Sequence, residues 1–296
     1  MTDRAVSTVV DVAVCLLVVS AAVVTLAGAP TPSADPAAGT AAETASVLGS
    51  TTATVEYSLG PDLRRADGDV TFPVTDGPAL SRSANGTLAG LLAAAAVGNL
   101  TADGVRLSHV GAGFRAAVRN ATRPLVSGPD WRGQVIATWE PYRGSHLSGR
   151  VVVGPAPPSD VDVYTARLPV STGFPAVGDE ATATARDGGF AAVAATVADG
   201  VVAGLFPPER IRAQLQGPYP EGRLARLRYG EFASRYGVSP TGALDDRDVE
   251  RANDRLRSAI ADRVVTDLQA VFETPAAAAN AVRLGTVTLT VRTWSP

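Results

Sequence analysis

The chain has 296 residues, 46% of them hydrophobic, which is long enough for a membrane segment and a substantial folded core. It carries 29 acidic and 26 basic residues, every basic one an arginine, for a formal net charge of −3. That balance excludes the strongly basic surface on which nucleic-acid binding depends, so we expect no nucleic acid as a partner.

Cysteine and histidine are too scarce to indicate a disulfide framework or a metal centre. The single cysteine, Cys15, cannot form an intrachain disulfide. A zinc site would need both His109 and His146 together with carboxylates, and their spacing does not favour one. We therefore expect neither a metal nor a cofactor.

An apolar run over Ala5–Ala29 predicts a membrane helix. Residues 12–29 contain no charged side chain, and about 20 apolar helical residues are needed to cross a hydrocarbon core of about 30 Å. A cleaved signal peptide is the alternative, because Ala27 and Ala29 form an A-x-A site. The run is longer than the usual apolar region of about 7–15 residues, and Pro30 would follow the cut directly, so a retained anchor is favoured.

The charges that flank the run predict its orientation. Arg4 precedes it, and the next arginine after it is Arg64, so the positive flank is the N-terminal one. We expect a single-pass protein of the cell membrane with a cytoplasmic N-terminus, lipid as a partner, and the bulk of the chain outside the cell. The predicted parts are a leader at 1–4, a membrane helix at 5–29, a flexible tether at 30–50 and an ectodomain at 51–296, with a candidate sub-boundary near 172–188.

The segment DRAVSTVVDVAVCLLVV, Asp3 to Val19, resembles the start of haloarchaeal type IV pilins and pilin-like proteins. The resemblance implies that a prepilin peptidase cuts between Arg4 and Ala5, and that the apolar helix packs with other pilin-like subunits. Thr8 stands where that family has proline, and Asp11 where it has glycine. The overall build also resembles uncharacterised haloarchaeal envelope proteins encoded with pilus-like machinery.

Asp11 is the one acidic residue within the apolar run. A carboxylate costs about 2.5–3.5 kcal/mol at the centre of a membrane helix and less near the interface. One interpretation is a hydrated interfacial side chain. The other, which the resemblance implies, is a pair with the cationic N-terminus of a neighbouring subunit.

Hydrophobic periodicity predicts an α+β ectodomain with a mostly antiparallel sheet and a helical C-terminal half. Strands are predicted over 52–59, 133–139, 149–153, 161–168 and 285–294. Helices are predicted over 86–99, within 105–125, and over 190–206, 208–216, 221–236 and 245–272. We expect the last strand to return to the sheet of the first. The apolar stretch 190–206 is interrupted by Asp199 and stopped by Pro207, which favours a buried helix over a second membrane crossing.

Three sequons make Asn85, Asn99 and Asn120 candidate N-glycosylation sites on the side predicted to lie outside the cell. Such short motifs also arise by chance in a Thr-rich chain. Trp131, Trp139 and Tyr142 form an aromatic cluster, which at a strand end is more typical of a sealed core edge than of a ligand site.

No catalytic motif emerges, and we do not expect an enzyme. Gly111, Gly113 and Ala116 match a G-x-G-x-x-A dinucleotide pattern, with Asp130 downstream, but no βαβ repeat follows and close helix packing is favoured. Five arginines, Arg210, Arg212, Arg223, Arg226 and Arg228, are interleaved with glutamates. They indicate either a solvated face or, less favoured, a site for an acidic partner or anionic sugars.

These observations predict a membrane-anchored surface protein, either a minor pilin or a pilin-like structural or assembly component of an archaeal type IV pilus-like or secretion-like system. The alternative is a plain membrane-tethered ectodomain with a binding function and no part in a filament. An extracytoplasmic enzyme is the third and least favoured reading, since it would need a cleft with convergent polar groups.

Overall fold

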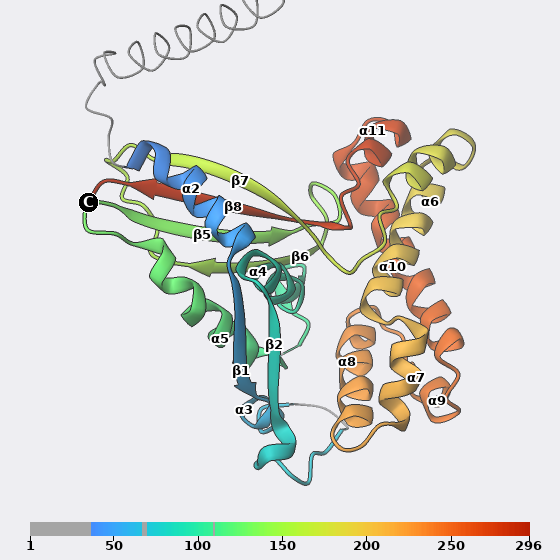
Figure 1. Cartoon of the computed structure of the whole chain (residues 1–296). Coiled ribbons are helices and arrows are strands. Elements are labelled where there is room, and N and C mark those ends of the chain that lie inside the picture. The colour runs from blue at the N-terminus through green and yellow to red at the C-terminus, as the bar shows by residue number, and fades with distance from the viewer. Residues whose placement is uncertain (1–36, 67–69, 109) are drawn as a thin grey trace, which may run out of the picture. The chain divides into compact units, whose positions relative to one another are not determined.

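The computed structural model describes residues 37–66, 70–108 and 110–296. The expected leader, membrane helix and first part of the tether lie outside the described residues, as do Arg4, Ala5 and Asp11. Ala37–Pro296 forms one compact unit of mixed α+β structure (Figure 1).

The centre of this unit is a six-stranded antiparallel sheet with the strand order β4-β3-β6-β5-β8-β7. Its strands are β3 (Leu100–Ala102), β4 (Val105–Arg106), β5 (Arg132–Trp139), β6 (Leu147–Val153), β7 (Tyr164–Ser171) and β8 (Thr286–Trp294). The last strand lies between β5 and β7, with Val135 opposite Val291 and Leu168 opposite Leu289. The prediction of an antiparallel sheet is confirmed.

Two helices cover one face of this sheet. On β8, Val287, Leu289 and Val291 are buried while Thr288 between them is exposed, which is the alternation of a sheet with one covered face. The helix α2 (Ala37–Ser50) lies over β7 and β8, and α4 (Leu88–Val97) lies over β5 and β6 (Figure 1).

The helix α2 corrects the prediction of a flexible tether over 30–50. Ala37, Ala41, Ala45 and Leu48 recur every three or four residues and are buried on the sheet. The hydroxyl of Thr293 on β8 donates a hydrogen bond of 2.9 Å to the carbonyl of Ala37. Small residues predominate in this segment, which is typical of a linker, but alanine has the highest intrinsic helix propensity and small side chains permit close packing.

A separate two-stranded ribbon extends from the sheet and corrects the expected pairing of the first strand. Among the described strands, β1 (Thr52–Ser58) pairs with β2 (Ser81–Thr87) and not with β8. The sequence of β2, SRSANGT, contains no large apolar residue, so its pattern predicts no strand. The ribbon leads to the short helix α3 (Gly60–Leu63) and the turn Pro78–Leu80, and α5 (Ala112–Thr122) packs along it before a second turn, Arg123–Val126.

The C-terminal half is helical, as predicted, apart from the closing strand. Its helices are α6 (Gly178–Leu205), α7 (Pro208–Gln216), α8 (Glu221–Arg235), α9 (Thr241–Asp245), α10 (Val249–Val271) and α11 (Pro275–Asn280). Helix α6 packs on α10 and α11. The Asp248 carboxylate caps α10 by accepting the N–H of Arg251 at 3.0 Å, and Leu256, Ile260 and Val264 bury the predicted stripe.

Within the described residues, one helical stretch, Gly178–Gln216, is long and apolar enough to cross a membrane by length and composition alone. It is interrupted by non-helical backbone at Gly189 (φ 61°) and includes Pro207. Its apolar face is used inside the fold, where Val193, Val197 and Val201 are buried. A Cβ atom at Gly200 would lie 2.3 Å from the side chain of buried Leu284, so the close approach requires glycine.

Candidate functional site

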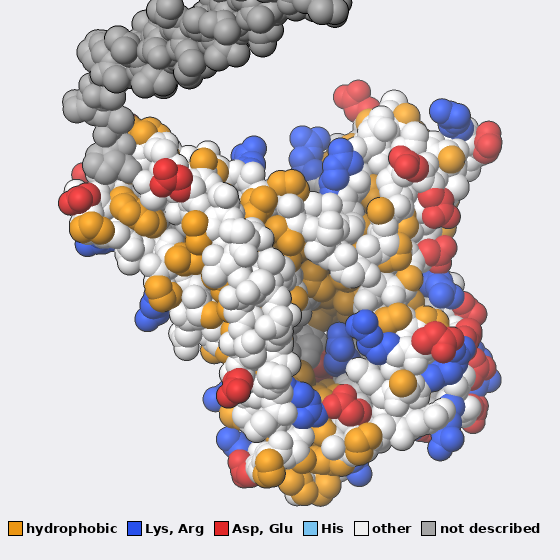
Figure 2. Space-filling view, in the orientation of Figure 1, with side chains coloured by type: hydrophobic (Ala, Val, Ile, Leu, Met, Phe, Trp, Pro, Cys, Tyr) orange, Lys and Arg blue, Asp and Glu red, His pale blue; other side chains and the backbone are white. Residues whose placement is uncertain are grey.

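A cavity of about 670 Å³ lies where the ribbon, the sheet layer and the C-terminal helices meet (Figure 2). Small-molecule pockets in proteins typically measure about 300–1,000 Å³. The wall is assembled from β1, β2, β3, α4, α5, α6, α7 and α8, together with Leu107, Ser108, Val110, Gly111 and segment 171–174. Elements that are far apart in the sequence therefore converge on one space.

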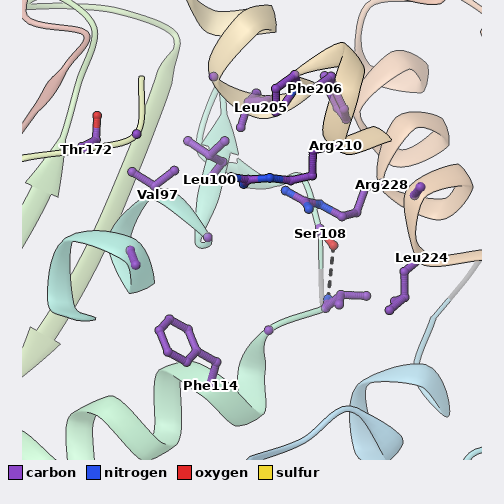
Figure 3. Close-up of a pocket in the computed structure, with 18 of the residues that line it drawn as sticks. Val97, Leu100, Ser108, Phe114, Thr172, Leu205, Phe206, Arg210, Leu224 and Arg228 are labelled. Carbon is purple, nitrogen blue, oxygen red and sulfur yellow. Dashed lines mark hydrogen bonds between the residues drawn. The ribbon is translucent and has the colours of Figure 1, made fainter. Parts of the chain in front are cut away.

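Much of the wall is apolar. Figure 3 shows Val97 and Leu100 on one side, Leu205 and Phe206 on a second, and Phe114 at some remove from them. Phe206 is held in place by its neighbours, since its ring stacks on Tyr229 with centroids 4.0 Å apart. Such a surface favours contact with the apolar part of a ligand.

The polar part of the wall contains four arginines, of which two are committed to the fold. Arg82 on β2 pairs with Glu221 on α8 at 2.7 Å. Arg115 on α5 is buried, and its guanidinium lies 3.5 Å from the carbonyl oxygen of Gly98. Burial lowers the pKa of Arg115, and the nearby positive charge of Arg106 lowers it further.

The other two, Arg210 on α7 and Arg228 on α8, project into the cavity side by side (Figure 3). In the part of the chain that the structure describes, neither guanidinium forms a hydrogen bond or ion pair. Burial among protein atoms lowers the pKa of Arg228, and the positive charge of Arg210 lowers it further, while Glu231 and Tyr229 act in the opposite direction. Arg228 nevertheless keeps solvent-exposed surface, and it lines the cavity.

The five arginines of the predicted charged face thus separate into two groups. Arg212 pairs with Glu209 at 2.8 Å and with Glu250, and Arg226 pairs with Asp245 at 2.5 Å. Arg223 donates to the carbonyl of Thr71 at 2.6 Å. These three are bound on the surface, whereas the remaining two line the cavity. Nothing in the sequence separates the groups, because the difference depends on how α7 and α8 pack.

A second polar cluster joins the sheet to the helices and is closed to solvent. His146, just before β6, contacts the Asp267 carboxylate on α10 through Nδ1 at 2.5 Å and the Tyr236 hydroxyl through Nε2 at 2.8 Å. The Tyr142 hydroxyl and the backbone N–H of His146 each donate to Asp267 at 3.0 Å. Tyr142, His146 and Asp267 are each at most 9% exposed, so these groups hold the two layers together.

The pKa values in this cluster follow its hydrogen bonds. Burial by itself would raise the pKa of Asp267, but the side-chain and backbone hydrogen bonds from His146, its electrostatic interaction with the carboxylate, and the hydrogen bond from Tyr142 hold that pKa below its ordinary value. Burial raises the pKa of Tyr142 and of Tyr236. Both phenols therefore stay protonated and serve as hydrogen-bond groups.

The glycine pattern at Gly111 and Gly113 lies at the N-terminus of α5, where the carboxylate of Asp62 accepts backbone hydrogen bonds. The N–H groups of these two residues point to Asp62 Oδ2, at 2.8 and 3.4 Å. Asp62 is buried and occupies the position that a phosphate would take at a helix N-terminus. Asp130 lies exposed in the segment before β5. The structure therefore favours close packing over nucleotide binding here.

The candidate glycosylation sites differ in accessibility. Asn120 is exposed near the end of α5. Asn85 is exposed on β2, but its amide donates to Thr54 Oγ1 at 2.8 Å. Asn99 is half-buried and donates to the carbonyl of Arg150 at 2.7 Å, which makes it the least suited of the three.

Two of the three residues of the predicted aromatic cluster seal the core, whereas Trp131 is only half-buried, just before β5. Trp139 and Tyr142 are buried, and the Trp139 indole N–H donates to the carbonyl of Leu284 at 2.8 Å. Phe174 packs on Trp139 with ring centroids 5.0 Å apart. Among the described residues, which do not include His109, no three His, Cys, Asp or Glu side chains are placed to hold a metal ion.

Fold and site together define an α+β domain with a partly apolar cavity that presents two cationic side chains. The chain belongs to a family of unknown function (DUF7284), whose model matches residues 10–294. No curated protein and no solved structure matches the chain.

Proposed function

We propose that the protein is a membrane-anchored binding protein of the cell surface. In this proposal, residues 5–29 anchor the chain with its N-terminus in the cytoplasm, and residues 37–296 form an extracellular domain that holds a ligand. The observation that carries the binding role is the cavity, with its size, its apolar wall and the two arginines that face it.

The anchor is supported by composition and by the extent of the family. Residues 12–29 carry no charge, and the family model begins at residue 10, so most of the apolar run belongs to the shared sequence. A binding role is favoured over catalysis because the Asp267–His146–Tyr236 cluster, whose groups resemble a proton relay, is buried in the joint between the layers and is absent from the cavity wall.

The anchor is tested by alkaline carbonate extraction of native membranes, followed by protease treatment of intact cells. We expect the full chain to stay in the membrane pellet and the domain to be degraded from outside. Release of the full-length chain into the carbonate supernatant would overturn the anchor, and protection from external protease would overturn the orientation.

A pilin-like role is the second candidate, supported by the resemblance of Asp3–Val19 to haloarchaeal type IV pilins. In that case a prepilin peptidase removes the leader between Arg4 and Ala5, the partners are other pilin-like subunits, and Asp11 pairs with a neighbouring N-terminus. Mass spectrometry of the N-terminal peptide from native membranes separates the candidates. A start at Ala5 supports assembly, an intact Met1 supports a plain tether, and a start near Pro30 contradicts both.

A further inference from the structure

Two guanidinium groups facing one cavity define the chemistry of its ligand. We propose that the cavity binds an organic anion, with its phosphate or carboxylate group held between Arg210 and Arg228 and its apolar body against the wall around Leu100 and Phe206. This assignment rests on the proposed binding function and names the class of ligand for the same site.

The case for an anion begins with the contrast among the arginines of α7 and α8. Arg212 and Arg226 each reach a carboxylate of the chain, and Arg82, across the cavity, reaches Glu221. Arg210 and Arg228 instead lie close enough to repel one another, and among the described residues neither forms an ion pair, although the charge of Glu231 on the same helix acts on Arg228. Two adjacent cations in a partly desolvated space favour a bound anion, and guanidinium forks match the oxygens of phosphate and carboxylate.

The case for an apolar body rests on the rest of the wall. Val97, Leu100, Leu107, Phe114 and Phe206 line the same space as the arginine pair. The cavity, at about 670 Å³, is far larger than a free phosphate ion requires. Ser108 adds one further polar group to the wall, and its oxygen accepts the N–H of Val110 at 3.2 Å (Figure 3).

The test measures binding to the full chain in nanodiscs of phosphatidylcholine, by isothermal titration calorimetry with empty nanodiscs as blank. Phenyl phosphate is the probe, and inorganic phosphate and benzyl alcohol represent its two halves. We expect phenyl phosphate to bind at least about tenfold more tightly than either half. Arg210→Gln and Arg228→Gln should each weaken it by about tenfold or more, because each removes a charge-assisted contact.

Matched variants separate the site from general charge and fold effects. Arg186→Gln removes the same charge from an exposed position on α6 outside the cavity and should leave binding unchanged. Ala94→Trp fills the cavity from α4 and should abolish binding, whereas Ala183→Trp, at an exposed position on α6 outside the cavity, should not. Without ligand, Arg228→Gln should not lower the thermal midpoint, since it relieves repulsion.

Each outcome bears on a stated claim. Equal binding of benzyl alcohol and phenyl phosphate, both lost in Ala94→Trp, would overturn the anionic class while leaving the binding function standing. Equal weakening by Arg186→Gln would show a non-specific charge effect and overturn the site. Absence of phenyl phosphate binding in the unmodified chain would overturn the inference, while the anchor is decided separately by carbonate extraction.

Discussion

At the scale of single residues, Asp267 is the point where several polar groups of the sheet layer meet the C-terminal helices. One carboxylate oxygen receives the Tyr142 hydroxyl, the backbone N–H of His146 and contact from its ring, while Arg263 lies 3.5 Å from the other. Its side chain is 9% exposed, so loss of the carboxylate would leave the Tyr142 hydroxyl and the His146 N–H buried without their acceptor.

Replacing Asp267 by Asn is therefore expected to destabilise the fold by roughly 2–4 kcal/mol at pH 7, because an amide places a donor among donors and removes the charge. Urea unfolding followed by circular dichroism measures this. Tyr142→Phe is the matched control, since it removes a single hydroxyl from the same oxygen and should cost about 1 kcal/mol. A loss for Asp267→Asn no larger than for the control would mean that the carboxylate is not the centre of the joint.

The same residue predicts the response to acid. Its pKa is lowered in the fold from an ordinary value of 3.8, so its contribution to stability is present above that value and is lost as the pH falls from there through the lower folded pKa. The stability gap between the unmodified chain and Asp267→Asn should therefore shrink below about pH 4. Unfolding curves at pH 7, 5 and 3 give the gap, and a constant gap would contradict the ionised role.

At the scale of elements, α2 is where the structure departs furthest from the sequence-based expectation. Leu48 is fully buried, whereas its neighbour Val47 is 39% exposed on the same helix. Leu48→Ala should lower the free energy of unfolding by about 2–5 kcal/mol, because it leaves a cavity against the sheet. Val47→Ala should change it by less than about 1 kcal/mol. If the two substitutions have equally small effects in thermal or urea unfolding, α2 does not pack on the sheet and the prediction of a flexible tether stands.

The other elements show what a sequence can and cannot predict. The bounds of α7 and β8 and the buried stripe of α10 followed from periodicity, because each has one polar and one apolar face. Strand β2 has no apolar face, so periodicity does not reveal it. The buried face of α2 is made mostly of alanine, which a hydrophobic pattern does not distinguish from a linker. The pairing of β1 with β2 depends on contacts that no local pattern encodes.

The cavity could not be predicted for the same reason. Its two arginines lie 18 positions apart on different helices, within a run of arginines that look alike in sequence. The packing of α7 on α8 and on α10 places Arg210 and Arg228 at the cavity wall, while Arg212 and Arg226 meet carboxylates outside it. The arginine-rich segment indicates an acidic or anionic partner only as the less favoured interpretation. The position of Arg210 and Arg228 at the cavity wall makes that interpretation testable.

At the scale of the whole molecule, the contacts of the described unit predict that anchoring and binding are separable. Residues 37–296 form a compact unit whose first residue, Ala37, is fully buried and bonded to Thr293 on β8. The described residues that line the cavity all belong to this unit. The fold and the arginine pair should therefore not depend on residues 1–34.

A chain that lacks residues 1–34 is thus expected to unfold in urea within about 0.5 kcal/mol of the full chain, the range typical of changes outside a folded core. It should bind phenyl phosphate with an unchanged dissociation constant, yet leave the membrane fraction, because the apolar run is gone. A truncated chain that stays with the membrane would place the membrane contact in the folded unit, with the Gly178–Gln216 stretch as the first segment to test. A chain that folds normally but loses binding would show that the N-terminal residues contribute to the site.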